Sequence, residues 1–228
     1  GITESVDQPM VNLVSHAAQS KLVEVRHGWA EANASEVRDA MASSGAFELD
    51  PTARDVAFVI NLEPGEYTAE MSSAGSSGVG LVEVYALDHE SEPSAGRLLN
   101  ISTRSHAGSG SDALIAGFVV SGTQSRRILV RGAGPALAGY GVAGYMENPE
   151  LRVYAASDDS LVAQNDDWVA DSALASAVTA TGAFSFQPGS RDAAVLIELA
   201  PGTYTAVLVP ASGGEGVALV EVYEVPVQ

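Results

Sequence analysis

The stretch Leu219-Val220-Glu221-Val222-Tyr223 decides the fold, because the same five residues occur earlier in the chain as Leu81-Val82-Glu83-Val84-Tyr85. In both copies β-branched residues alternate with other side chains, which is typical of a half-buried β-strand. The two copies close a repeat of about 80 residues, and internal self-similarity is the signature of a duplicated structural unit. A chain that carries both copies shows which positions the fold requires.

Residues that precede this stretch also align between the copies. The matched segments are Pro9 with Pro149, Trp29 with Trp168, Gly45-Ala46-Phe47 with Gly182-Ala183-Phe184, Arg54-Asp55 with Arg191-Asp192, and Pro64-Gly65-Glu66-Tyr67 with Pro201-Gly202-Thr203-Tyr204. The spacing between partners changes only in predicted loops and helix starts, where insertions are tolerated. Because residues 97–148 have no match before the first copy, we expect a partial repeat at 1–88, a linker at 89–96 and a full repeat at 97–228.

Short strand-like runs separated by glycine and proline dominate the second copy. We predict strands at Leu98–Arg104, Ala113–Ser121, Arg126–Arg131, Leu151–Ala155, Leu161–Gln164, Ala193–Leu199, Tyr204–Val209 and Val217–Val225, with a matching closing strand at Val79–Leu87 in the first copy. The turns Glu63-Pro64-Gly65-Glu66 and Ala200-Pro201-Gly202-Thr203 are predicted as type II, which places their glycines at positive φ.

One short helix is predicted in each copy. In the second copy Leu174, Ala177 and Val178 lie on one helical face, after a possible N-cap at Asp171 or Ser172 and before a stop at Gly182. Val37, Ala40 and Met41 repeat this spacing before Gly45. The expected fold class is all-β: a jelly-roll-like β-sandwich repeated twice, with one short helix in each repeat.

Composition excludes several classes of function. Hydrophobic residues make up 46% of the chain, which is enough for a core, and no apolar run is long enough for a membrane-spanning helix. The absence of cysteine excludes disulfides, thiolate metal sites and cysteine nucleophiles. The net charge of −18 argues against nucleic-acid binding, which needs clustered basic residues, and fits extracellular surroundings better.

The charge is unevenly distributed along the chain. Residues 1–96 carry 4 basic and 16 acidic side chains, a net −12, whereas residues 97–152 carry 6 basic and 3 acidic ones. Two interpretations of this basic island remain open. It is either a docking patch for an acidic partner or a set of alternating strand positions, in which Arg127, Leu129 and Arg131 share an outer face while Ile128 and Val130 point inward. The basic residues are Arg97, Arg104, Arg126, Arg127, Arg131 and Arg152.

Three runs of the second copy carry a family resemblance. Leu151-Arg152-Val153-Tyr154, Leu161–Asp167 and Leu199–Thr205 resemble the jelly-roll modules of the pre-peptidase C-terminal type that are appended to secreted bacterial proteins. With Leu99–Arg104 and Ile128–Pro135, they are also similar to uncharacterised repeats of large secreted bacterial proteins. The resemblance implies a non-catalytic accessory or surface module outside the cell, and it transfers no catalytic residue.

Two motifs with the residue types of an enzyme are better explained as loops. The glycine-rich run 132–139 has Leu137 where a dinucleotide-binding fingerprint needs glycine. His106 lies among Ser105, Ser109 and Asp112, but no nucleophile elbow is present, so we expect a flexible polar loop. The histidines lack the spacing of a zinc site. Because no repeat contains a coherent nucleophile, base and orienting group, we expect no enzymatic activity.

An oxygen-rich cluster is the candidate metal site. It comprises Asp158, Asp159, Asn165, Asp166 and Asp167, residue types that bind calcium. The matching positions Arg26-His27-Gly28 of the first copy cannot bind calcium, so the fold itself does not require these carboxylates. They form either a calcium site specific to the second copy or a set of solvated turn residues.

Aromatic residues provide the candidate ligand site. Tyr140 and Tyr145, in the predicted loop 139–148, are candidates for a binding surface, whereas Trp29 and Trp168 match each other and are expected in the core. We therefore expect an extracellular, non-catalytic module for adhesion, spacing or surface interaction, or alternatively a calcium- or carbohydrate-binding accessory domain. Its expected partner is a protein or glycan at a cell surface, without nucleic-acid binding or membrane insertion. The open sheet edge of the partial repeat is expected to be covered by the second copy or by a second chain in a homodimer.

Overall fold

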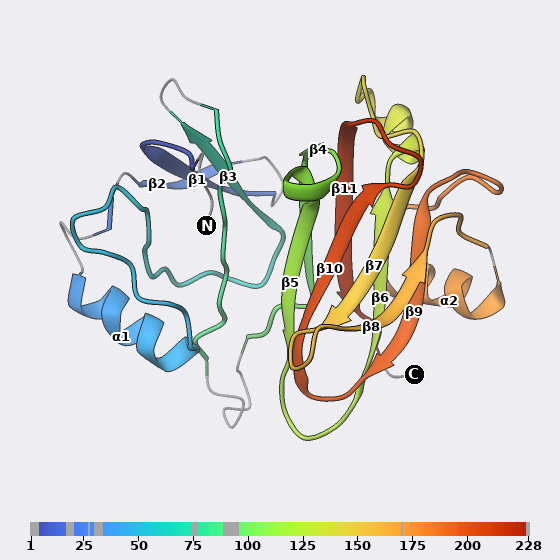
Figure 1. The fold of residues 1–228 in the computed structure, drawn as a ribbon. Coiled ribbons are helices and arrows are strands. Elements are labelled where there is room, and N and C mark those ends of the chain that lie inside the picture. Colours follow the sequence, from blue (N-terminus) through green and yellow to red (C-terminus); the bar gives the residue numbers. More distant parts are fainter. Residues whose placement is uncertain are drawn as a thin grey trace. The chain divides into compact units, whose positions relative to one another are not determined.

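The fold is described from a computed structural model of the chain (Figure 1). The structure describes residues 5–16, 21–26, 28–29, 34–73, 77–88, 96–169 and 171–226, and for residues 21–26 the backbone alone. The chain divides into two compact units, Gly1–Arg97 and Leu98–Gln228, which are described separately. Most of the predicted linker, residues 89–95, lies outside the described residues. In the part of the chain that is described, no helix is long and apolar enough to cross a membrane.

The second unit is a β-sandwich. Two antiparallel sheets, with strand orders β5-β10-β7-β8 and β4-β11-β6-β9, lie one in front of the other in Figure 1. Their bounds are β4 (Asn100–Ala107), β5 (Leu114–Val120), β6 (Arg126–Ala133), β7 (Pro149–Ala155), β8 (Ser160–Asn165), β9 (Ala193–Leu199), β10 (Gly202–Pro210) and β11 (Gly216–Glu224). Leu151, Val153, Ala206, Leu208 and Val220 are fully buried between the sheets, because their alternating positions all point inward. The predicted all-β sandwich class is confirmed for this unit.

The first and last strands of this unit are neighbours. β4 pairs with β11 in antiparallel register, with Asn100 opposite Tyr223 and Ala107 opposite Gly216. β11 pairs with β6 along its other edge, so the repeated pentapeptide Leu219–Tyr223 is the middle of a three-strand ladder. This position explains why Val220 and Val222 are buried.

A second, smaller core lies on the outer side of β6 and β9, beneath the helix α2 (Ser172–Thr181). The N-cap prediction is confirmed, because the Asp171 carboxylate accepts a hydrogen bond from the Leu174 amide at 2.7 Å. The predicted C-terminal end of the helix is also confirmed, since Gly182 caps it in the left-handed conformation with φ of 72°. Leu174 and Ala177 pack against Leu129 of β6 in this core.

The prediction that Arg127, Leu129 and Arg131 form an exposed outer face of β6 is wrong. Arg131 and Leu129 are both fully buried, and only Arg127 of the three predicted outward residues is exposed. The reason is that α2 and the short 3-10 helix η2 (Pro135–Tyr140) cover this side of the strand. The alternation of side chains is present, but both faces of β6 are covered.

The predicted polar loop around His106 is also wrong. Ser105 and His106 lie in β4, which continues to Ala107, and a 3-10 turn η1 (Gly110–Asp112) follows. Both residues are held in the ladder by β11, where Val217 lies opposite His106 and Ala218 lies opposite Ser105. The regular pairing with a long neighbouring strand overrides the polar, turn-forming composition.

The first unit contains one three-stranded sheet of order β2-β1-β3 and the helix α1 (Ala34–Ser44). Its strands are β1 (Pro9–Ser15), β2 (Lys21–Arg26) and β3 (Tyr67–Ser73). β3 pairs with β1 so that Tyr67 faces Ser15, as Tyr204 of β10 faces Ala155 of β7. The hairpins β1-β2 and β7-β8 each contain one register shift, and it falls at matching places, Leu13/Val14 and Val153/Tyr154.

Two side-chain contacts also occur in both units. The indole N–H of Trp29 donates to the Asp50 carbonyl at 3.3 Å, and that of Trp168 donates to the Gln187 carbonyl at 3.2 Å. The hydroxyl of Tyr67 donates to the Glu63 carbonyl, and that of Tyr204 donates to the Ala200 carbonyl, each at 2.9 Å. These tryptophans and tyrosines therefore fix loop ends, which agrees with a structural role for Trp29 and Trp168.

Other parts of the predicted repeat do not form. The segment Val79–Leu87 is not a strand, and its β-pairing with other described residues is limited to an isolated parallel bridge between Val79 and Ser5. Neither Gly65 nor Gly202 has positive φ, so the type II turns are wrong; β10 already begins, in extended backbone, at Gly202. A second complete sandwich is not confirmed, because the described residues of the first unit form a single sheet.

Candidate functional site

Arg131 is the most unusual side chain of the second unit, because it carries a charge and is buried completely. Its guanidinium carbon lies 4.4 Å from the ring centre of Phe184 and 4.0 Å from that of Phe186. Both distances are within the range of cation–π attraction. The arginine extends from β6 into the small core beneath α2, where aromatic rings replace water around the charge.

Glu221 is the ionic partner of Arg131. The β6-β11 register places the two residues opposite each other, and the distance from Arg131 Nη1 to Glu221 Oε2 is 3.4 Å. The hydroxyl of Tyr223 donates a hydrogen bond to Glu221 Oε1 at 2.7 Å. Burial raises the pKa of the Glu221 carboxyl, and Arg131 and the tyrosine hydroxyl offset only part of that effect.

Burial likewise lowers the pKa of Arg131, and Glu221 supplies the largest opposing charge. The guanidinium stays protonated, because its ordinary pKa is far above neutral pH. The pair is therefore a fixed charge pair in an apolar space. Removing one member of such a pair leaves an uncompensated buried charge, whereas replacing both by apolar groups changes the stability much less.

Asp192 is a second fully buried acidic residue, and its hydrogen bonds are all structural. Oδ1 accepts from the amides of Gly134 at 2.8 Å and Ala136 at 3.1 Å, and Oδ2 accepts from the Ser190 hydroxyl at 2.7 Å. The amides of the glycine-rich run thus already bind a carboxylate of the chain itself. The run is a loop held by Asp192, and those two amides are not available to a phosphate group.

A small cavity opens beside Arg131. It has a volume of about 150 Å³ and is lined by Arg131, Trp168, Leu174, Ala175, Val178, Thr179, Ser185, Phe186 and Ala194. No described protein atom accepts a hydrogen bond from Arg131 Nε, Nη1 or Nη2. The volume suits a few water molecules at about 30 Å³ each, and it is below the roughly 300 Å³ of typical ligand pockets. The cavity contributes hydroxyls but no carboxylate or imidazole.

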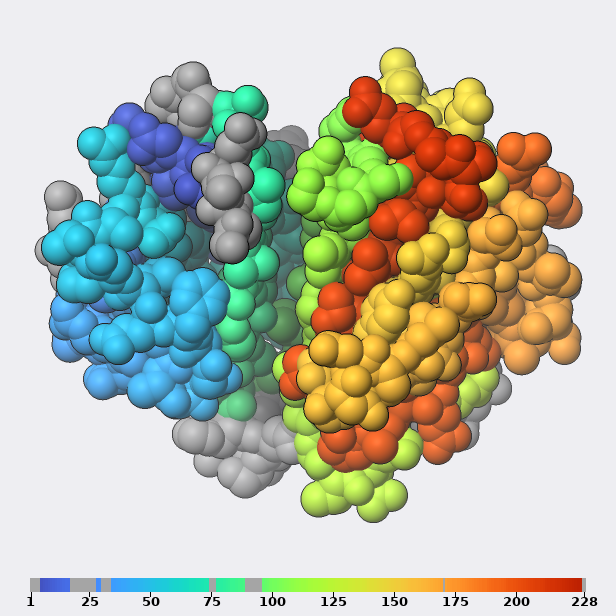
Figure 2. Space-filling view, viewed as in Figure 1, coloured from blue at the N-terminus to red at the C-terminus, as the bar shows by residue number. Residues whose placement is uncertain are grey.

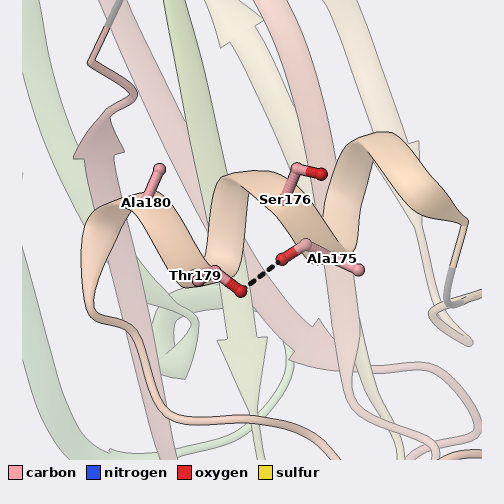
Figure 3. A pocket seen from close by; sticks show the side chains of 4 residues that line it. All are labelled: Ala175, Ser176, Thr179 and Ala180. Carbon is pink, nitrogen blue, oxygen red and sulfur yellow. Dashed lines mark hydrogen bonds between the residues drawn. The ribbon is translucent and has the colours of Figure 1, made fainter. Parts of the chain in front are cut away.

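The outer surface of α2 carries a shallower depression of about 350 Å³, shown in Figure 3. Its lining residues are Ala175, Ser176, Thr179 and Ala180. The Thr179 hydroxyl donates to the Ala175 carbonyl at 3.0 Å, as the dashed line in Figure 3 shows, and the Ser176 hydroxyl donates to the Ser172 carbonyl at 2.7 Å. Both hydroxyls therefore bond to their own helix, and the depression offers little to a ligand.

The candidate calcium residues separate into two groups. Asp158 and Asp159 lie in the turn before β8, whereas Asn165, Asp166 and Asp167 lie at the end of that strand. Six residues of strand place the two groups on the order of 15–20 Å apart, so they do not meet at one ion. Among the residues that the structure describes, no group of three or more His, Asp or Glu side chains is arranged to hold a metal.

Two members of this cluster have structural hydrogen bonds. Asp158 Oδ1 accepts from the Ser160 amide at 3.2 Å, as expected for a turn aspartate. Asn165 Oδ1 accepts from the Ala194 amide at 2.9 Å, and its Nδ2 donates to the Asp167 carbonyl at 3.0 Å. Asn165 therefore joins the end of β8 to β9 across the edge of the sandwich. Calcium binding by either group alone stays an untested alternative to a role as solvated turn residues.

The two candidate tyrosines have different environments. Tyr140 ends η2 and is 64% exposed, with its ring 5.0 Å from that of Phe184 in an edge-on contact. Tyr145 packs against the small core and makes an isolated bridge with Val217. Tyr140 thus begins a row of aromatic rings that continues through Phe184 and Phe186 to Trp168.

The basic island does not act as one uniform patch. Arg131 is buried, Arg152 makes a two-point contact with Glu150 at 2.7 and 2.9 Å, and Arg126 lies 3.5 Å from Glu224. Arg97, Arg104 and Arg127 are exposed. Arg126, Arg131 and Arg152 are therefore paired with acidic groups of the second unit.

The outer face of the sheet β5-β10-β7-β8 exposes apolar side chains. Ile115 and Val119 of β5 are 57% and 67% exposed, and Leu161 and Val162 of β8 are also exposed. This face is turned toward the viewer in Figure 2, where the strands of the sheet lie at the surface. The sequence predicted these strands but not which of their faces would stay uncovered.

Sequence reasoning missed the roles of Phe184, Phe186 and Asp192. A signal was present for two of them, because Phe184 and Asp192 match Phe47 and Asp55 in the alignment of the copies. That these residues lie near Arg131 could not be predicted from nearby sequence. Their proximity depends on how β6, β11 and the segment after α2 pack together.

No protein-family model and no curated protein matches this sequence. Among solved structures, the chain is similar to the pre-peptidase C-terminal domain of a collagenase from Bacillus anthracis, with 14% identity and a TM-score of 0.34. The match covers 54% of this chain and 89% of that chain. That domain is of the module type that the sequence resembles.

Proposed function

We propose that the chain is a non-catalytic accessory module of a secreted protein, and that its second unit contacts other proteins through the sheet β5-β10-β7-β8 and its edge strand β5. One observation carries the proposal: β5 exposes Ile115 and Val119 on the outer face of that sheet. Exposed apolar patches of this kind mark interaction surfaces in soluble proteins.

The neighbouring side chains extend this apolar surface. Val207 of β10 lies opposite Ile115, and Thr203 lies opposite Val119. Arg152 of β7 belongs to the same face, and its charge is compensated by Glu150. Branched aliphatic side chains gain from removal from water, and this favours a protein partner.

The edge of β5 supports the same function. β5 is an outermost strand of its sheet, and its sequence Leu114–Val120 contains neither a charged residue nor a proline. Natural edge strands commonly carry lysine or proline to prevent pairing with other chains. The absence of these devices makes β5 suitable for strand addition by a partner.

A scaffold role agrees with the use of polar residues in this unit. Asp192, Asn165 and Asp171 all accept hydrogen bonds from backbone amides, and Glu221 pairs with Arg131. Each of these groups thus stabilises a loop, the end of a helix or a pair of strands. An extracellular location is proposed from the acidic composition.

A second candidate function, carbohydrate binding, is favoured by Tyr140. Its exposed ring rests edge-on against Phe184, so it is held as a platform on which a sugar ring can stack. A glycan array with the full chain and a Tyr140→Ala variant tests this alternative. Binding that disappears with the tyrosine would support it, and an array without signal would end it.

The main proposal is tested by self-association, with the chain as its own probe. We expect sedimentation velocity at rising concentration to show association of the wild type and its loss in a Val119→Asp variant. Val169→Asp is the matched control, because Val169 is 75% exposed in the loop after β8 and lies outside the sheet face. A wild type that stays monomeric throughout, or an equal effect of both variants, would contradict the proposal.

A further inference from the structure

We propose that the first unit binds an extended segment of another polypeptide, patterned like β6, whose arginine lies opposite Glu83. The proposal concerns a different unit from the sheet face discussed above and does not depend on it. It follows from a comparison of the surroundings of Arg131 in the second unit with the same positions of the first.

Every acidic or aromatic group around Arg131 that belongs to an aligned segment has a counterpart in the first unit. The pairs are Glu221 with Glu83, Tyr223 with Tyr85, Asp192 with Asp55, and Phe184 with Phe47. One contact of this set is already made, because the Tyr85 hydroxyl donates to Glu83 Oε1 at 3.1 Å, as Tyr223 does to Glu221. The first unit therefore carries, by sequence match, the acidic and aromatic residues that surround Arg131 in the second, and the Tyr85–Glu83 contact is the part of that arrangement that the structure describes.

The arginine that these groups bind in the second unit, and the strand that carries it, have no counterpart among the described residues of the first unit. In the second unit, Arg131 comes from β6, and β11 is paired along both edges by β4 and β6. In the first unit the sheet has only the order β2-β1-β3, which corresponds to β8-β7-β10, and residues 81–87 are in no described ladder. Residues 81–85 therefore share the sequence of the central part of β11, but among the described residues they lack the neighbouring strands that β11 has.

The side chains that such neighbours would cover are exposed. Leu81, Val84 and Phe47 are 67%, 50% and 56% exposed, whereas the matching Leu219, Val222 and Phe184 are buried or half-buried. Keeping this much apolar side-chain surface in water is unfavourable. Binding would be favoured by the free energy gained when a partner covers these side chains.

Charge and geometry specify the occupant. Residues 1–96 carry a net −12, so a cationic segment is attracted to the unit. Because residues 81–87 lie outside the described ladders, an extended partner can form strand hydrogen bonds with them, as in β-strand addition. In the β6-β11 register, arginine lies opposite the glutamate, with Val130 and Gly132 beside it. The occupant is therefore a strand of aliphatic residues with an arginine at its centre.

The experiment uses a labelled synthetic peptide with the sequence of residues 124–136 as the probe and the full 228-residue chain as the receptor. Fluorescence anisotropy should show saturable binding. Two control peptides separate recognition from general charge attraction: a scrambled peptide and an Arg131→Lys peptide, which keeps the charge but loses the planar guanidinium. We expect both to bind at least about tenfold more weakly.

Receptor variants identify the site. Glu83→Gln should weaken binding of the peptide by at least about tenfold. Glu70→Gln removes the same charge from the exposed side of β3 and should leave the affinity within about twofold. Because the peptide controls do not alter the receptor, they remain decisive if a receptor variant folds poorly. No saturable binding, equal binding of the scrambled peptide, or equal effects of the two receptor variants would overturn the proposal.

Discussion

Arg131 and Glu221 face each other across the adjacent strands β6 and β11, 3.4 Å apart, with both side chains excluded from water. Two phenylalanine rings flank the guanidinium, and Tyr223 holds the carboxylate in place. A charge pair in this position makes each partner depend on the other, because either one alone would be a buried and uncompensated charge.

Replacing Arg131 with methionine should destabilise the second unit by about 3–5 kcal/mol near neutral pH, because Glu221 would lose its counter-charge. Glu221 already has a raised pKa, and this substitution raises it further. A raised folded-state pKa gives stability that is present below the unfolded value of about 4.3 and is lost as pH rises through the folded value. The defect should therefore shrink toward acidic pH.

Urea denaturation followed by Trp168 fluorescence measures this effect, in a Trp29→Phe background that removes the signal of the first unit. The matched control is the double variant Arg131→Met/Glu221→Leu, which removes both charges and should recover most of the loss. A single variant as stable as the double one at all pH values would contradict the role of the pair.

Gly134→Ala should destabilise the second unit by about 1–3 kcal/mol, because the new methyl group would overlap the Met146 carbonyl oxygen, a backbone atom that cannot move alone. Gly139→Ala is the control, since nothing lies within 4 Å of the point that its new methyl group would occupy and its φ is not positive. Thermal unfolding of the two variants should differ clearly. Equal melting temperatures would mean that the loop adapts.

Asp171→Ala should cost about 1 kcal/mol, because it removes the N-cap hydrogen bond to the Leu174 amide. Asp166→Ala, which removes a carboxylate from the exposed end of β8, should change the unfolding free energy by less than about 0.5 kcal/mol. Urea denaturation of both variants provides the comparison. A larger loss for Asp166 would point to an unrecognised role of that residue.

The pKa of Asp158 should lie below its ordinary value, because Ser160 donates hydrogen bonds to the carboxylate. Ser160→Ala should raise this pKa toward the ordinary value, and a carboxyl NMR titration measures both. The depressed pKa gives stability that is present above the unfolded value of about 3.9 and is lost as pH falls through the folded value. An unchanged titration in the variant would show that the serine hydroxyl does not contribute.

Calcium at about 5 mM should leave the melting temperature unchanged, because the two halves of the acidic cluster lie at opposite ends of β8. Magnesium at the same concentration controls for ionic strength. A rise specific to calcium that is lost in Asp166→Asn or Asp167→Asn would instead establish a site at the end of the strand.

Local signals explain which parts of the fold were predictable. Asp171 and Gly182 mark the ends of α2 because capping depends on nearby residues alone. The burial of Arg131 was not predictable, since it depends on α2 and η2 covering the second face of β6. The pentapeptide beginning at Leu81 gives the clearest case: its sequence equals that of the central part of β11, and only the neighbouring strands differ.

The candidate site was predictable in part for the same reason. The position of Tyr140 in the predicted loop 139–148 suggested an exposed side chain, and its ring is exposed, whereas its role in binding is untested. Phe186 and Asp192 are distant in sequence from Arg131 and approach it only when β9 pairs with β6. Long-range pairing of this kind leaves no periodic pattern in a single sequence.

The pairing of β4 with β11 also has a mechanical consequence. Asn100 and Tyr223 lie opposite each other, so the two chain connections of the second unit leave the ladder at the same end. Tension transmitted along the polypeptide would therefore peel these strands apart one hydrogen bond at a time, instead of shearing the whole ladder at once. Such a unit should yield at low force and lengthen.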